Sequence, residues 1–173
     1  SMRDWRQVLQ QWIAQEGTIV SLAKLHVEFI AWAISPPSFE HWPSHLPNCQ
    51  ALQDFYRLCD GGYFNWFRWV SLSQLGEQNR KWFQLLSDWD TRGDVLLPER
   101  HVVLAEDEGG CPVVWDAATD QVRAFQFDGG DWEPPLASSV EAFLTNLFNP
   151  EDEQEKDWWY LFLSWLDSHL KEG

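Results

Sequence analysis

The sequence predicts an α+β fold in which a single, mainly antiparallel sheet is wrapped by helices. Apolar residues at spacings of three and four, which are typical of amphipathic helices, occur near both ends of the chain. Between residues 101 and 128, short β-branched runs alternate with turns rich in Gly, Asp and Glu, which indicates an antiparallel meander. With 173 residues, of which 45% are hydrophobic, the chain is long enough for one domain with a sizeable core.

Residues 1–45 are predicted to form an N-terminal helical extension. A helix is expected over residues 3–15, ended by Gly17, because its apolar residues share one face. These residues are Trp5, Val8, Leu9, Trp12 and Ile13. Thr18 can cap a second helix that continues to Ala33, so the two helices would form a hairpin. Four prolines between residues 35 and 47 predict an irregular connector to the next helix.

The rest of the fold is expected to be anchored by residues 46–62, which read LPNCQALQDFYRLCDGG. Pro47 suits a first helical turn, and Asn48 can cap the amides that follow. The apolar stripe of this helix would consist of Leu52, Phe55, Tyr56 and Cys59. Gly61 and Gly62 are expected to end the helix, because a left-handed residue after the last turn costs least without a Cβ.

The central part of the chain predicts strands interrupted by one helix. Residues 63–72 are aromatic and β-branched enough for a strand, and residues 73–89 have the apolar face of a helix inserted between strands. The meander is then expected to use residues 102–105, 111–116 and 122–128. The linking sequences EDEGG and AATDQ are typical of turns.

Two helices are predicted to close the chain. A short edge piece over residues 132–136 would tolerate its two prolines. Ser138 or Ser139 would then cap a helix over residues 140–148. Residues 149–173 begin with a run of acids and continue as a helix with Trp, Leu and Phe around most of its circumference. We expect this last helix to be buried on more than one side and to pack on the N-terminal hairpin.

Three of these segments, in this order, resemble the signatures of the SMI1/KNR4 (SUKH) superfamily. They are the anchor stretch 46–62, the strand, Gly-Gly turn and strand pair of 101–128, and LASSVEAFLTNLF at 136–148. The positions that match the recurrent residues of the family are Leu46, Pro47, Phe55, Gly61, Gly62, Asp107, Gly109, Gly110, Phe143 and Leu144. The resemblance implies an SMI1/KNR4-like domain over residues 46–148, to which the N-terminal extension and the helix of 149–173 are added.

The resemblance also implies a protein that binds rather than catalyses. Bacterial members of the superfamily are widely immunity proteins that bind and neutralise a toxin, often a nuclease. Eukaryotic and viral relatives are interaction or scaffold domains. The resemblance therefore implies an immunity protein for a cognate toxin, or alternatively an intracellular or viral adaptor.

The charge of the chain restricts its partners. Asp and Glu outnumber Lys and Arg by 27 to 12, which gives a formal net charge of -15. Nucleic acid and anionic membrane surfaces would be repelled, so a basic protein is the expected partner. The alternative is that the acidic balance keeps a protein with 13 Trp soluble. Three cysteines without close spacing, no membrane-spanning run and no signal-peptide pattern at the start lead us to expect a cytoplasmic protein.

The candidate contact residues are turn acids and tryptophans beside turns. We expect a negative surface formed by Glu106, Asp107, Glu108, Asp116, Asp128 and Asp131. Trp66, Trp69 and Trp132 lie next to turns and glycines, where an exposed indole could anchor an interface. The competing interpretation is that the acids are solvated turn residues and that the tryptophans belong to the core.

We predict no catalytic residue, cofactor or metal site. His41, His45 and Cys49 have the four-residue spacing of metal ligands on a helix, but Pro43 and Pro47 would break that helix. Nucleophile elbows and phosphate-binding loops are not found in the sequence. An enzyme acting through a pair of turn carboxylates is the remaining alternative, and it requires two acids in one concave pocket.

Overall fold

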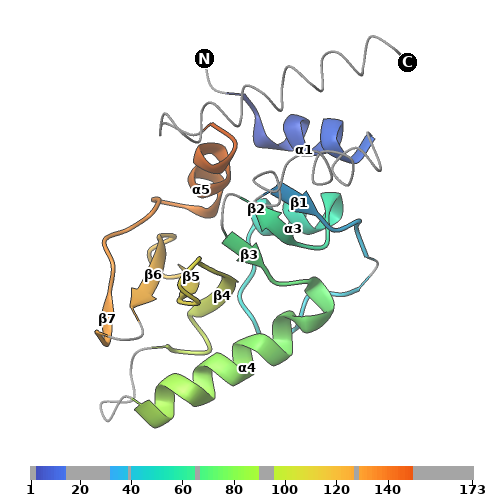
Figure 1. Cartoon of the computed structure of the whole chain (residues 1–173). Coiled ribbons are helices and arrows are strands. Elements are labelled where there is room, and N and C mark those ends of the chain that lie inside the picture. The colour runs from blue at the N-terminus through green and yellow to red at the C-terminus, as the bar shows by residue number, and fades with distance from the viewer. Residues whose placement is uncertain are drawn as a thin grey trace.

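The computed structural model describes residues 3–14, 32–38, 40–64, 67–89, 96–126 and 129–149. The helices are α1 (Trp5–Ala14), α3 (Gln50–Leu58), α4 (Leu72–Trp89) and α5 (Val140–Leu147). The strands are β1 (Trp32–Ile34), β2 (Gly62–Phe64), β3 (Phe67–Trp69), β4 (His101–Glu106), β5 (Pro112–Asp116), β6 (Val122–Gln126) and β7 (Asp131–Trp132). All the described strand pairs are antiparallel and follow chain order from β1 to β7, so the predicted α+β class is confirmed (Figure 1).

The predicted meander is present as β4, β5 and β6. Pairing of Val103 with Val114, and of Val114 with Arg123, sets its register. Nearly every residue of β4 and β5 is buried, because helices cover both faces of the sheet at this point. This double burial explains why these strands read as continuous apolar runs instead of alternating with polar residues.

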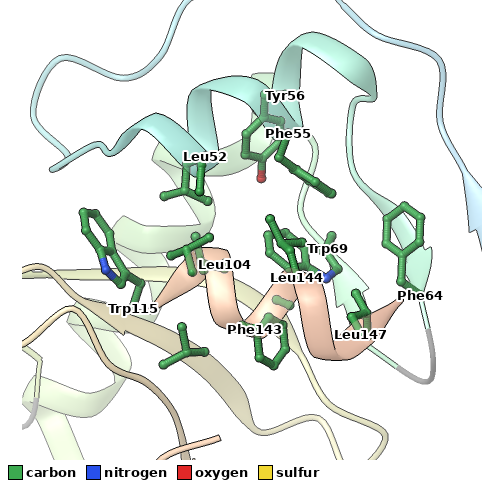
Figure 2. Close-up of a cluster of buried hydrophobic side chains, with 14 of the residues drawn as sticks. Leu52, Phe55, Tyr56, Phe64, Trp69, Leu104, Trp115, Phe143, Leu144 and Leu147 are labelled. Carbon is green, nitrogen blue, oxygen red and sulfur yellow. The ribbon is translucent and has the colours of Figure 1, made fainter. Parts of the chain in front are cut away.

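One face of the sheet carries the larger core. Residues of α1, α3 and α5 pack there on alternate residues of the strands, such as Leu104 and Trp115. Figure 2 shows Leu52, Phe55 and Tyr56 of α3 converging with Phe143, Leu144 and Leu147 of α5 and with residues of the sheet. The first predicted helix therefore contributes Trp5, Val8 and Leu9 to the same core as the anchor helix.

The opposite face is covered by α4, which in Figure 1 lies well apart from α1 and α5. Trp82 and Leu86 of α4 form a smaller cluster with strand residues that alternate with those of the main core. Asn79, which is fully buried, accepts a hydrogen bond from the Val103 amide at 2.7 Å and donates one to the Val103 carbonyl at 3.0 Å. Its side chain thus satisfies both backbone groups of a strand residue and fixes α4 to the sheet.

Two predicted elements differ from the structure. Residues 63–72 do not form one strand, since β2 and β3 pair with each other and Leu72 already begins α4. The aromatic residues in both strands hide this break in the pattern. Residues 32–34 form the strand β1, paired with β2, where the sequence predicts the end of a second helix. The rest of that predicted helix lies outside the described residues.

The anchor helix is shorter than predicted. Its N-cap is Cys49, which makes no side-chain capping bond. Among the described residues, the Asn48 side chain accepts a hydrogen bond from the amide of Cys49 and from no amide further along the helix. The helix ends at Leu58, and the following backbone is extended. Gly61 has a φ of 79°, and a Cβ there would come within 2.7 Å of the Trp69 carbonyl oxygen. Glycine is therefore needed for close approach to β3, and it does not cap the helix.

One further local prediction is confirmed. Ser139 caps α5 by accepting a hydrogen bond from the Ala142 amide at 2.9 Å. The cysteines, Cys49, Cys59 and Cys111, are all free. The helix predicted within residues 149–173 falls beyond the described part of the chain. None of the helices that the structure describes has the length and apolar character needed to cross a lipid bilayer.

Candidate functional site

The predicted acidic residues are divided between the two ends of the meander. Glu106 ends β4, Asp107 and Glu108 follow in the β4–β5 turn, and Asp131 begins β7 at the same end of the meander. The strand register places Glu106 opposite Pro112 and Asp131 opposite Gln126. The β4–β5 turn and the start of β7 therefore lie along one edge of the sheet, where the strands end. We name this edge, with these four acids, the acidic end.

Within the acidic end, the four carboxylates have different surroundings. Asp107 is structural, because its Oδ1 accepts from the amides of Gly109 at 3.0 Å and Cys111 at 2.9 Å. Glu108 and Asp131 are exposed, and Asp131 Oδ1 accepts from the Trp132 amide at 2.9 Å. Glu106 is half-buried opposite Arg68 of β3. The structure gives Glu106, Glu108 and Asp131 no ion pair with any residue that it describes. Their negative charge is therefore open to a partner.

Asp116 lies at the other end of the meander and does not belong to this surface, contrary to the prediction. Its carboxylate takes a bidentate pair from Arg100, with Nε–Oδ1 at 2.7 Å and Nη2–Oδ2 at 2.6 Å. The Ala118 amide also donates to it at 2.9 Å. The Arg100 hydrogen bond is the main reason why the pKa of Asp116 falls to about 2. Asp116 is thus neutralised within the fold, and a partner would have to compete with Arg100.

Asp116 lines a small pocket on the α4 face of the sheet. The pocket has a volume of about 190 Å³. Its lining residues are Leu97, Arg100, His101, Val114, Asp116, Arg123 and Trp132. Trp132, predicted as an interface anchor, is half-buried here and stacks on His101 with ring centroids 5.7 Å apart. The structure thus brings Asp116 and Trp132 together away from Glu106, Asp107 and Glu108, although Trp132 directly follows Asp131 of the acidic end.

The other two predicted tryptophans do not supply an anchor that the structure describes. Trp69 is 3% exposed and contacts Phe55, with ring centroids 4.4 Å apart, in the main core. The expectation of an exposed indole is therefore wrong for Trp69, because the short strand β3 turns it inward between α3 and α5. Trp66, together with the predicted acid Asp128, lies outside the described residues.

Sequence reasoning missed the polar residues of the pocket, Arg100, His101 and Arg123. His101 is only 7% exposed, and its Nδ1 accepts a hydrogen bond from the Leu97 amide at 2.8 Å. This bond places the ring proton on Nε2, and burial lowers the pKa of His101, so the ring is neutral. The sequence contains one signal that could have indicated the pocket. Arg123 is a cation within an apolar strand of a strongly acidic chain.

The pocket shows what chemistry is possible. Among the residues that the structure describes, its lining contains a single carboxylate, so this pocket lacks the pair of acids that glycoside hydrolysis would need. Over the same part of the chain, no three His, Cys, Asp or Glu side chains gather in a way that could hold a metal ion. Two arginines, one neutral histidine and an indole can instead bind and orient an anion.

Comparison with known proteins adds no further assignment. No protein-family model matches the chain, and no curated protein or solved structure is significantly similar to it. The resemblance to the SMI1/KNR4 superfamily therefore stays a prediction from the sequence.

Proposed function

We propose that this chain is a non-catalytic binding protein whose acidic end docks on a basic protein partner. The observation that carries the proposal is the set of exposed carboxylates at the acidic end that have no ion pair among the described residues. A net charge of -15 adds a long-range attraction for cationic surfaces. Charge complementarity of this kind speeds association and selects partners.

The turns that present these acids are held in place by hydrogen bonds. Asp107 accepts two amide hydrogen bonds, and its own amide donates to the Cys111 carbonyl at 2.9 Å. The Cys111 thiol lies 3.8 Å from Gln126 Oε1, which links the β4–β5 turn to the strand before the β6–β7 turn. A preorganised surface loses less conformational entropy when it binds.

The sequence resemblance selects the class of partner. An SMI1/KNR4-like protein with an acidic surface would act as an immunity protein that covers the basic, nucleic-acid-binding site of a cognate toxin. The alternative is an adaptor domain of the same superfamily, which would use the surface for another basic protein. A toxin gene next to the gene for this chain would favour immunity, and its absence would favour the adaptor.

The test is capture of partners by the immobilised full chain from an extract of its native host, identified by mass spectrometry. The double variant Glu108→Lys with Asp131→Lys reverses charge at the acidic end. A matched double variant, Glu40→Lys with Glu99→Lys, makes the same charge change at exposed acids elsewhere. We expect the first variant to slow association with the captured protein by about tenfold or more at low salt, and the control by about twofold at most.

A third variant tests the same surface in the opposite direction. Arg68 is exposed on β3 opposite Glu106, so Arg68→Gln removes a cation from the rim of the acidic end. Association should then become faster and its salt dependence steeper. Equal effects of the two double variants, or binding that is insensitive to salt, would contradict the proposal.

A further inference from the structure

The pocket on the α4 face plays no part in the proposed docking. It combines apolar walls with a cation that has no ion pair among the described residues. We propose that this pocket binds a small monocarboxylate through the guanidinium of Arg123. The pocket reaches Trp132, the neighbour of Asp131, but its cation Arg123 is not part of the acidic end, so Arg123→Gln and the charge reversal at the acidic end test the two proposals separately.

Arg123 is the available cation of the pocket. Its Nε donates to the Glu133 carbonyl at 2.9 Å, and its guanidinium lies 5.7 Å from the ring centroid of Trp132. These contacts orient the side chain, yet the structure shows no ion pair between Arg123 and any residue that it describes. Arg100, by contrast, has its Nε and Nη2 bound to Asp116. A ligand anion is therefore expected to engage Arg123.

The local charge matches an anion with one negative charge. Arg100 and Asp116 cancel, and His101 is neutral in the tautomer that its Nδ1 hydrogen bond imposes. Among the lining residues, this leaves the single positive charge of Arg123. The exposed acid Glu99, whose charge acts on His101, lies outside the lining. The Nε2–H of His101, which lies 3.8 Å from Asp116 and beyond hydrogen-bond distance, is a second donor in the pocket wall. A dianion would exceed the local charge and would be repelled by a chain of net charge -15.

The size and the walls of the pocket restrict the ligand further. A volume of about 190 Å³ is smaller than the roughly 300–1,000 Å³ of most small-molecule sites, so only a small group fits. Leu97, Val114 and Trp132 supply apolar surface beside the cation. A planar carboxylate suits the fork of a guanidinium, and a short apolar body suits these walls. The carboxylate could belong to a free organic acid or to the end of a polypeptide chain.

The test is an NMR titration of the ¹⁵N-labelled full chain that follows the indole N–H of Trp132, assigned with Trp132→Phe. The probes are sodium acetate, sodium benzoate, inorganic phosphate and sodium chloride at matched ionic strength. We expect saturable shifts with acetate and benzoate, tighter binding of benzoate, and no saturation with chloride. Phosphate that binds more tightly than benzoate would overturn the assignment to a monocarboxylate.

Variants locate the site. Arg123→Gln should weaken benzoate binding by roughly tenfold or more, and Arg123→Lys, which keeps the charge but loses the fork, should have an intermediate effect. Arg57→Gln removes an exposed arginine of α3 and should change the affinity by about twofold at most. Equal benzoate affinities in Arg123→Gln and Arg57→Gln, with both variants showing native spectra, would refute the proposal.

A peptide pair distinguishes the two sources of the carboxylate. N-acetyl-Gly-Gly-Phe with a free C-terminus is compared with the same peptide as the C-terminal amide. Tighter binding of the free acid than of benzoate, lost in the amide, would indicate a polypeptide terminus. Binding of benzoate that exceeds that of both peptides would indicate a free organic acid.

Discussion

The two faces of the sheet are covered in chemically different ways. On the face of α1, α3 and α5 the contacts are almost entirely apolar. The indole N–H of Trp69 is buried there without a hydrogen-bond partner among the residues that the structure describes. On the α4 face lie Asn79 and His101, the two polar side chains counted as buried in the described chain. The face of α1, α3 and α5 therefore supplies most of the stability. The α4 face buries fewer apolar residues, and it contains specific polar contacts and a cavity.

This difference explains why the pocket lies where it does. A cavity on the larger face would remove contacts from closely packed aromatic rings and would cost free energy in proportion to its size. On the α4 face the sheet is covered by one helix, and the edge near Trp132 is left for charged groups. A binding function is easier to accommodate there, because Arg100 and Asp116 already satisfy each other.

The largest expected effect comes from truncating the same residue type on each face. Phe55 is fully buried against Trp69, Tyr56 and Phe64 on the larger face, and Phe125 packs against Trp132 on the α4 face. We expect Phe55→Ala to lower the free energy of unfolding by about 5 kcal/mol and Phe125→Ala by about 3 kcal/mol. Urea unfolding measures both, and equal losses would show that the two faces contribute alike.

The next effect tests the polar attachment of α4. Asn79→Ala leaves the amide and the carbonyl of Val103 buried and unpaired, which should cost about 3 kcal/mol. Gln74→Ala, at an exposed position of the same helix, should stay within about 0.5 kcal/mol. Both are compared by thermal and urea unfolding. A loss below about 1 kcal/mol for Asn79→Ala would mean that apolar packing alone holds the helix.

A smaller and pH-dependent effect is expected at the pocket. In the folded protein the pKa of Asp116 is lowered from 3.8 to about 2, chiefly by the Arg100 hydrogen bond, so folding favours the ionised form. The resulting stability is present above about pH 4 and is lost as the pH falls towards 2. The Arg100 side chain is 39% exposed, so solvent screens its ion pair with Asp116. We therefore expect this pair to contribute about 1–2 kcal/mol to the free energy of unfolding.

Asp116→Asn should remove this contribution at pH 7 and match the parent chain near pH 2. Glu99→Gln, an exposed acid without an ion pair in the described chain, serves as the control and should stay within about 0.5 kcal/mol across this range. Unfolding free energies measured between pH 2 and 7 would decide the point. A pH-independent difference between Asp116→Asn and the parent chain would contradict the ion-pair account.

The comparison of faces also shows what the sequence could predict. Helical periodicity identified α1, α4 and α5, and turn chemistry located the meander, because both patterns are local. Register and alternation across the sheet are not local, so nothing in the sequence paired Arg100 with Asp116 or placed Trp132 on His101. The acids at the β4–β5 turn were grouped correctly with Asp131. Asp116 was wrongly assigned to the same group, because the sequence does not show at which end of the sheet a strand terminus lies.

The smallest expected effect separates folding from docking at the acidic end. Asp107→Ala removes two turn hydrogen bonds and should cost about 1 kcal/mol, while its neighbour Glu108, exposed and unpaired within the described residues, should tolerate Ala within about 0.5 kcal/mol. Asp131→Ala, which also removes the hydrogen bond that Asp131 Oδ1 accepts from the Trp132 amide, should cost only slightly more than Glu108→Ala in the same urea experiment. If both are neutral, the fold does not need these charges, and any loss of partner binding on reversing them reflects a lost contact. A cost above about 1 kcal/mol for either would mean that these two acids support the fold as well.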